Sequence, residues 1–150
     1  MPEKKFNEWN KLKNELHTHD VYFYYREGEV WFCSIGANIG WEQDGKHELF
    51  ERPVIVIKKL RLSLFLGVPC SSSVKRGQYF FEITHAGKIF TALLLQVCVF
   101  DARRLQRKLY VVEHNQFLGI VITLCSMIKT SAPPFSGASE QIGDTEIPFD

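Results

Sequence analysis

Apolar residues recur every three or four positions near the N-terminus, a spacing that gathers side chains on one face of a helix. Phe6, Trp9, Leu12 and Leu16 follow this pattern, with lysines and glutamates between them. The pattern predicts an amphipathic helix over residues 3–19, whose apolar stripe packs against the rest of the protein.

The middle of the chain has short apolar runs separated by turns that are rich in glycine and polar residues. These runs contain many β-branched and aromatic residues and are shorter than ordinary helices, so we interpret them as strands. A turn at residues 26–28 divides the first run, Gln96 interrupts the fifth, and the second and third are expected to form a hairpin. The predicted strands cover residues 21–35, 53–57, 60–68, 79–83, 90–100 and 111–112.

Two further helices are predicted towards the C-terminus. Asp101 is a suitable N-cap for a short helix over residues 102–109, which carries several basic side chains. Apolar residues at helical spacing predict a closing helix over residues 113–129. Short strands with peripheral helices predict a mainly β protein, a small antiparallel β-barrel, because closure removes exposed sheet edges.

Length and composition indicate one domain with an extension at each end. The 150 residues are 45% hydrophobic and 13% aromatic, which is enough for a packed core. We divide the chain into an N-terminal helix (1–20), a main domain (21–129) and a flexible acidic tail (130–150). No apolar run reaches the roughly 18 residues that span a bilayer, and the N-terminus lacks an apolar signal-peptide segment. A cytoplasmic protein without membrane association is therefore expected.

Charge is distributed unevenly along the chain. The net charge is +1, but residues 130–150 contain four acidic side chains and no basic one. The preceding residues hold 18 basic and 13 acidic side chains, a net charge of +5. Such a body is compatible with an anionic partner, and ordinary solvated charge explains it equally well.

The four cysteines are spread along the chain without a C-x-x-C pair or a neighbouring histidine. Zinc ligands usually come in close pairs, so no metal site is expected. Three of the four cysteines lie in apolar runs, where a buried free thiol is the usual outcome. Three histidines lie in predicted turns or helix starts, and we assign no function to them: His47, His85 and His114.

The glycine-rich stretch 36–58 contains the first candidate for chemistry. Its glycines allow the positive φ angles of a tight, exposed loop, and a buried strand follows. Pro53 fixes the backbone next to Arg52, so this arginine presents a fixed cation to an anion where the loop meets the strand. A surface ion pair between Arg52 and either Glu51 or Asp44 is the alternative.

Several short motifs, in this order and spacing, resemble one protein family. They are Glu29-Val30-Trp31, Gly40-Trp41-Glu42-Gln43-Asp44-Gly45, Arg52-Pro53-Val54-Ile55-Val56-Ile57, Pro69-Cys70-Ser71-Ser72, and Leu95-Gln96-Val97 with Asp101 and Arg104-Leu105 after it. Over residues 22–128 the chain resembles the MazF/PemK (Kid-like) toxins of type II toxin–antitoxin systems. The N-terminal helix and the tail lie outside the core pattern of that family.

The resemblance implies an SH3-like barrel of the MazF/PemK/CcdB type, a homodimer and a toxin that inhibits growth. It also implies a sequence-specific endoribonuclease that cuts single-stranded mRNA without a metal ion or cofactor. A cognate antitoxin would fill the RNA groove, and DNA would be bound only through the toxin–antitoxin complex. The resemblance matches the family's catalytic residues to Arg52 and Ser71, and its RNA-binding residues to Glu42, Gln43, Ser72 and Gln96.

This chemistry suits the residues that are present. The 2′-hydroxyl of RNA is the nucleophile, so DNA resists cleavage, and the site must stabilise extra negative charge on the phosphorus. The Arg52 guanidinium offers a bidentate fork for phosphate oxygens, and the Ser71 hydroxyl offers a further hydrogen bond. Glu42 is a conceivable general base, and Trp41 is suited to stacking on a splayed nucleobase.

The chain departs from the family pattern mainly at two positions. Ser71 replaces the usual threonine, which keeps the hydroxyl and loses the methyl group that restricts its rotamer. Cys98 stands where an arginine is usual, so a contact with the RNA backbone is lost, and Cys70 is a milder change from an aliphatic residue. We expect reduced but not abolished cleavage.

Two alternatives remain open on the sequence. The first is a barrel that binds RNA or an antitoxin without cutting, which Cys98 favours. The second is a toxin that poisons a protein target such as DNA gyrase. The Arg-Pro and Pro-x-Ser motifs argue against the second alternative, because the gyrase-poisoning branch does not rely on them.

Overall fold

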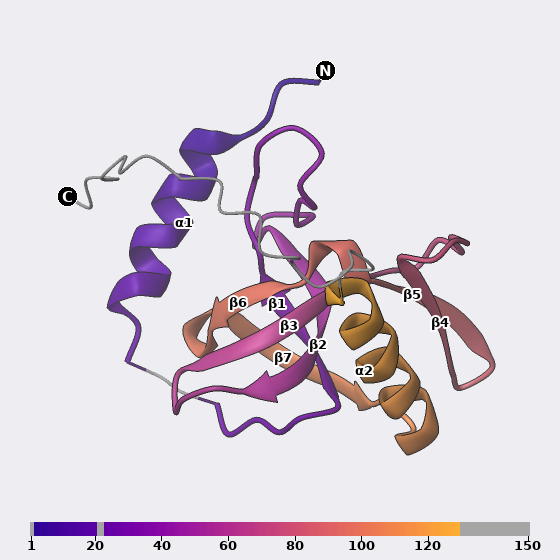
Figure 1. Cartoon of the computed structure of the whole chain (residues 1–150). Helices are drawn as coiled ribbons and strands as arrows, with labels where there is room; N and C mark the ends of the chain where they lie inside the picture. Colours follow the sequence, from indigo (N-terminus) through magenta and orange to yellow (C-terminus); the bar gives the residue numbers. More distant parts are fainter. Residues whose placement is uncertain (1, 21–22, 130–150) are drawn as a thin grey trace, which may run out of the picture.

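The computed structural model describes residues 2–20 and 23–129. In these residues a helix stands at each end and the strands lie between them (Figure 1). The predicted acidic tail, residues 130–150, lies outside the described residues. The elements are α1 (Phe6–Thr18), β1 (Glu29–Ser34), β2 (Glu51–Lys59), β3 (Leu64–Ser71), β4 (Phe80–His85), β5 (Lys88–Leu93), the short 3-10 helix η1 (Leu94–Gln96), β6 (Cys98–Asp101), the 3-10 helix η2 (Ala102–Arg104), β7 (Leu105–Val111) and α2 (His114–Ile128).

The strands form one antiparallel sheet in the order β4-β5-β3-β2-β1-β7, and β6 pairs with β3 beside this path. η1 breaks the predicted strand 90–100 into two, so β6 pairs with the first half of β3 and β5 with its end. The mainly β prediction is confirmed. Within the described residues, no pairing between β4 and β7 closes the path.

β2 lies inside the sheet and alternates between two clusters of buried side chains. Val54 and Val56 belong to one cluster, and Ile55 and Ile57 belong to the other. The second cluster includes Ile120 from α2, which packs beside the strands in Figure 1. The period of two is that of a strand buried on both faces. The predicted strand 53–57 and the predicted closing helix are both confirmed.

The predicted helix over residues 102–109 is wrong. Only Ala102–Arg104 is helical, and Asp101 caps this 3-10 turn by accepting a hydrogen bond from the Arg103 amide (2.9 Å). Leu105–Val111 then forms β7, because pairing with β1 satisfies its backbone and sets its basic side chains beside acidic ones. Two ion pairs result, Arg107–Glu51 at 3.1 Å and Lys108–Glu29 at 3.0 Å.

Of the predicted strand 21–35, the structure describes residues 23–35, and in these only Glu29–Ser34 forms a strand. A turn at Gly28, where φ is 85°, separates this strand from the preceding residues. Tyr25 is fully buried there, packs on Phe65 with ring centroids 5.3 Å apart, and donates its hydroxyl hydrogen bond to the carbonyl of Arg61 (3.2 Å). Side-chain packing therefore replaces strand pairing in this segment.

The predicted N-terminal helix is confirmed, but little of its apolar stripe is buried. Trp9 is the buried residue of α1, whereas Phe6 is 48% exposed. Figure 1 shows α1 standing beside the sheet rather than lying across one of its faces. No helix in residues 2–20 and 23–129 is long and apolar enough to cross a membrane.

The four cysteines are free thiols. Cys33 and Cys70 are buried, whereas Cys98 and Cys125 are exposed. The expectation that a cysteine in an apolar run is buried is therefore wrong for Cys98 and Cys125. Burial raises the pKa of the Cys70 thiol to about 12, which keeps it protonated at neutral pH. In the described part of the chain, no group of His, Cys, Asp and Glu side chains is arranged to hold a metal ion.

Candidate functional site

The loop between β1 and β2 is closed at its neck by main-chain hydrogen bonds. The amide of Gly36 donates to the carbonyl of Phe50 (3.2 Å), and the amide of Gly45 donates to the carbonyl of Gly36 (2.8 Å). Lys46 and Glu51 exchange two more bonds, at 2.9 and 3.0 Å. A folded backbone therefore carries the loop residues that the resemblance matches to RNA binding.

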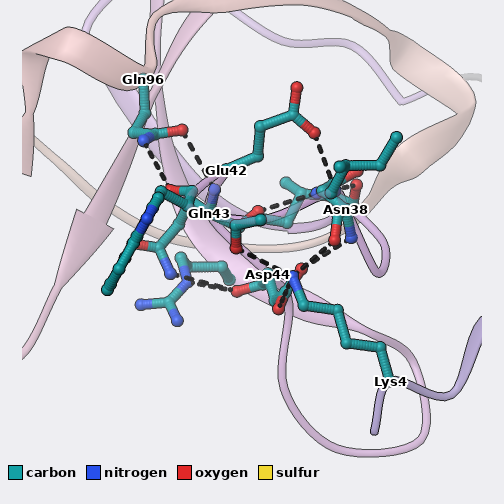
Figure 2. A network of polar contacts seen from close by, with 11 residues as sticks. Lys4, Asn38, Glu42, Gln43, Asp44 and Gln96 are labelled. Carbon is teal, nitrogen blue, oxygen red and sulfur yellow. Dashed lines mark hydrogen bonds and ion pairs between the residues drawn. The ribbon is translucent and has the colours of Figure 1, made fainter. Parts of the chain in front are cut away.

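Side chains inside the loop hold its tip together (Figure 2). Oδ1 of Asp44 accepts a hydrogen bond from the Asn38 amide (2.6 Å), and Nδ2 of Asn38 donates to the Gln43 carbonyl (2.8 Å). Oε2 of Glu42 accepts from the amide of Ile39 (2.9 Å). Glu42 and Gln43 thus lie in a loop that its own polar groups organise.

Gln96 joins this loop to the end of η1. Its Oε1 accepts a hydrogen bond from the Gln43 amide (3.0 Å), and its Nε2 donates to the Trp41 carbonyl (3.2 Å) (Figure 2). A glutamine inside an apolar run needs polar partners, and the loop supplies both. Trp41 itself is 92% exposed, so its indole is accessible for stacking.

Three of the predicted RNA-binding residues line one hollow, which we name the loop cleft. Its volume is about 470 Å³, and it lies between the loop, η1 and β6. The cleft is defined here by Glu42, Gln43, Gln96, Cys98 and Arg104.

Arg52 lies at the start of β2, directly after the neck of the loop, with its side chain half-buried. Its Nε donates to the Asp44 carbonyl (2.8 Å) and its Nη1 to the Cys70 carbonyl (3.5 Å). Burial lowers the pKa of this guanidinium, while the negative charge of Asp44 acts in the opposite direction. The side chain therefore connects the loop to the end of β3.

The alternative interpretation of Arg52, a surface ion pair with Glu51 or Asp44, is not what the structure shows. Both of its acceptors are main-chain carbonyls. The carboxylate of Glu51 pairs with Arg107 (3.1 Å), and that of Asp44 pairs with Lys4 (2.9 Å). Since a carbonyl oxygen carries no net charge, the guanidinium keeps its positive charge available to an anion.

Ser71 and Ser72 lie at the end of β3, next to the Cys70 carbonyl that Arg52 contacts. Oγ of Ser71 accepts a hydrogen bond from the Ser73 amide (3.2 Å), and its hydroxyl hydrogen can still be donated. Ser72 is exposed and shares a second hollow with Arg52. The two predicted catalytic residues are thus placed at the same end of β3.

We name this second hollow the basic cleft, and its volume is about 550 Å³. Its aromatic wall includes Tyr110, whose ring stacks on the His85 imidazole with centroids 4.0 Å apart and planes 10° apart. Glu51 also lines it, but its carboxylate is paired with Arg107. A cationic rim on an aromatic wall suits a nucleotide. The nitrogen-bearing side chains of the cleft are Lys46, His47, Arg52, His85 and Lys88.

The sequence pattern predicts only part of the basic cleft. No function is assigned from the sequence to His47 and His85, and Lys88 falls between the predicted strands 79–83 and 90–100. His47 belongs to the loop between β1 and β2. His85 and Lys88 reach the cleft of Arg52 because the β4–β5 hairpin lies along the end of β3, where Cys70 pairs with Ala92. That pairing joins segments about twenty residues apart, and no local pattern marks it.

Solved structures identify the fold of this arrangement. A MazF from Deinococcus radiodurans superposes with a TM-score of 0.59 and 18% sequence identity, over 70% of this chain and 96% of that chain. This chain has the MazF fold. A chain of the MazE-MazF crystal structure from the same organism gives a TM-score of 0.56 at 15% identity, over 73% of this chain and 99% of that one. No family model and no curated protein sequence matches.

The MazF fold accounts for about three quarters of this chain. An endoribonuclease from Mycobacterial species gives a TM-score of 0.56 at 10% identity and covers 76% of this chain and 100% of its own. The MazF/PemK-type architecture predicted from the motifs is therefore confirmed at the level of the fold.

In this MazF fold, Cys98 faces the loop cleft where the resemblance leads one to expect an arginine. Burial raises the pKa of the Cys98 thiol, and the nearby positive charge of Arg104 opposes that change. Arg104 lines the same cleft and donates from Nη1 to the Ser34 carbonyl (3.0 Å). The loop cleft thus contains a guanidinium despite the cysteine.

Proposed function

We propose that this protein is the toxin of a type II toxin–antitoxin system and a metal-independent endoribonuclease specific for short sequences in single-stranded mRNA. The observation that carries the proposal is the charged Arg52 guanidinium on the wall of the basic cleft, held by the carbonyls of Asp44 and of Cys70, the residue before Ser71. The MazF fold supports it, since a structure with this fold is an endoribonuclease from Mycobacterial species. Incubating the purified protein with single-stranded RNA in EDTA tests it.

In the proposed reaction, the 2′-oxygen of one nucleotide attacks the adjacent phosphorus and the bond to the 5′-oxygen breaks. A proton leaves the 2′-hydroxyl and another reaches the 5′-oxygen, so the products are a 2′,3′-cyclic phosphate and a 5′-hydroxyl. Arg52 stabilises the negative charge on the non-bridging oxygens, and Ser71 donates one hydrogen bond to them.

RNA is proposed to occupy both clefts. Glu42 lines the loop cleft and Arg52 lines the basic cleft, so a strand that spans the two meets both side chains. For Glu42 to accept the 2′-proton, its carboxylate must turn towards the phosphate that Arg52 binds, because the 2′-oxygen attacks the phosphorus of the same nucleotide step. Gln43, Ser72 and Gln96 contact the RNA from the same two walls. The exposed indole of Trp41 offers a stacking surface beside them.

The proposed partners follow from the same reading. A cognate antitoxin neutralises the protein in the cytoplasm by covering the clefts, the protein is a homodimer, and DNA is bound only through the toxin–antitoxin complex. The MazF fold occurs in a MazE-MazF structure and in an endoribonuclease bound to its cognate antitoxin, which supports an antitoxin partner. Light scattering of the purified protein tests the dimer, which a monomeric mass would contradict.

A barrel that binds RNA without cutting is the second candidate, favoured by Cys98 in the loop cleft. It predicts a stable complex with RNA and intact RNA after long incubation. A gyrase-poisoning toxin would instead inhibit purified gyrase equally well with and without Arg52. That result would remove the ribonuclease proposal.

Ser71→Ala is expected to lower the cleavage rate about a hundredfold, because one hydrogen-bond donor to a developing oxyanion contributes ~3 kcal/mol. Ser71→Thr keeps the hydroxyl and restricts its rotamer, so it is expected to cleave as fast as the natural protein or faster. Single-turnover cleavage of a labelled oligoribonucleotide measures both. Equal rates for the alanine variant and the natural protein would exclude Ser71 from the chemistry.

Lys88→Ala is expected to weaken RNA binding. It is also expected to reduce the slope of the logarithm of the binding constant against the logarithm of the salt concentration by about 1, the value for one lost phosphate contact. Lys88 is exposed on β5 and lines the basic cleft. Fluorescence anisotropy with a 2′-O-methyl oligonucleotide, which cannot be cut, measures the affinity between 50 and 200 mM salt. Lys11→Ala, on the exposed surface of α1, is the matched control and is expected to leave the slope unchanged.

A further inference from the structure

Lys4, just before α1, reaches across the loop between β1 and β2 (Figure 2). Its Nζ pairs with Oδ2 of Asp44 (2.9 Å) and donates hydrogen bonds to the carbonyls of Gly40 (3.3 Å) and Asn38. The Lys4 side chain is only 17% exposed, an unusual degree of burial for a lysine at the edge of a protein. One ammonium thus binds the tip of the loop and a carboxylate near its neck.

Trp9 holds the neighbouring turn of α1 against the neck of the same loop. Its indole lies directly over Gly36, where an added Cβ would be 2.4 Å from the ring. It packs on Phe50 with centroids 5.7 Å apart, and the Arg104 guanidinium lies 5.4 Å from its ring. Lys4 and Trp9 therefore fix the start of α1 to the loop at two separate points.

The contacts of Asp44 connect this attachment to Arg52. The Asp44 carboxylate binds Lys4, and the Asp44 carbonyl accepts the hydrogen bond from Nε of Arg52 (2.8 Å). A displacement of Asp44 therefore displaces the acceptor that orients the guanidinium. The ammonium of Lys4 also neutralises a carboxylate that would otherwise repel an RNA phosphate near Arg52.

We propose that the segment from Lys4 to Trp9 is a brace for the clefts, and that Lys4 is a positioning residue for Arg52. The catalytic part of this inference rests on the proposed ribonuclease function. The structural part does not, because it concerns the order of the loop in the protein without RNA. A segment outside the core pattern of the family thereby contributes to the activity.

Lys4→Met is expected to lower kcat for RNA cleavage about tenfold, because a small misplacement of a catalytic group has effects of this order or larger. KM is expected to change less than kcat, since Lys4 lines neither cleft. Lys4→Arg restores the ion pair and is expected to recover most of the activity. Lys11→Met, at an exposed position of α1 outside this segment, is the matched control and is expected to behave as the natural protein.

A double-mutant cycle tests whether Lys4 acts through Asp44. In an Asp44→Asn background, Lys4→Met is expected to have less than a twofold further effect on kcat, because the carboxylate that it neutralises is already absent. Full additivity of the two changes would contradict the proposed connection. Lys4→Met with unchanged kcat would overturn the catalytic part of the brace.

Hydrogen exchange of the protein without RNA tests the structural part directly. Lys4→Met is expected to speed exchange of the amides in residues 37–45 at least about fivefold, while β2 stays protected, because the loop opens locally. If the natural protein cuts no RNA, the proposed function fails and this measurement still decides the brace. Unchanged exchange in the loop would show that Lys4 does not hold it.

Discussion

Arg52→Ala is expected to lower the rate of RNA cleavage at least about a hundredfold, because it removes a guanidinium that lines the basic cleft and contacts the carbonyl of Cys70, the residue before Ser71. The bidentate, charge-assisted bonds that Arg52 offers a phosphate are stronger than those of a neutral donor. Single-turnover cleavage in EDTA, followed on a sequencing gel, measures the rate. Near-ultraviolet circular dichroism checks that the loop, which Arg52 also ties to β3, keeps its structure.

Two further arginine variants separate charge from geometry. Arg52→Lys keeps the charge and loses the planar fork, so it is expected to recover only a small part of the lost rate. Arg76→Ala removes an exposed arginine whose contact with Glu82 is loose, at 3.7 Å, and is expected to leave cleavage unchanged. Cleavage by Arg52→Ala at the rate of the natural protein would mean that another group carries the chemistry.

Gly45→Ala is expected to destabilise the fold by about 3 kcal/mol and to abolish most of the cleavage. An added Cβ at Gly45 would lie 1.7 Å from the Phe50 carbonyl oxygen, which is backbone and cannot rotate away. That carbonyl accepts the hydrogen bond from the Gly36 amide that closes the neck of the loop. The substitution therefore opens the neck and displaces Asp44, the neighbour that holds Arg52. Urea unfolding measures the loss of stability.

Gly40→Ala is the matched control for this prediction. Gly40 has a φ of 57°, and an added Cβ there would meet nothing within 4 Å. The substitution carries only the cost of the left-handed conformation, about 1 kcal/mol. Equal unfolding midpoints for the two variants would show that the neck tolerates a side chain at Gly45.

Local sequence patterns predict the elements whose formation does not depend on a distant strand or helix. The spacing of apolar residues in α1 and α2 and the β-branched run in β2 are properties of short segments, and these elements form as expected. The local pattern does not predict the structure of the segment 102–109, because its basic residues are compatible with a helix face and with an edge strand. The segment becomes a strand because it pairs with β1, some seventy positions earlier, and no local pattern contains that information.

The candidate site shows the same limit. Arg52 is predictable, because a proline fixes the backbone beside it at the end of a loop. The bonds that organise the loop are not, since Gln96 and Gln43 are 53 positions apart and Lys4 lies on a different element from Asp44. His85 and Lys88 reach the basic cleft only because a hairpin folds along β3. Residue types therefore indicate which side chains can take part in the chemistry. Where these side chains lie relative to one another depends on tertiary contacts.

The most direct test of the central claim uses two oligonucleotides of the same sequence, taken from a site mapped on single-stranded RNA in EDTA. One is all RNA, and the other carries a single 2′-deoxynucleotide on the 5′ side of the cut. The account predicts that the natural protein cuts the first into a 2′,3′-cyclic phosphate and a 5′-hydroxyl, and leaves the second intact. Cleavage of both oligonucleotides, or of neither in any RNA tested, would contradict it.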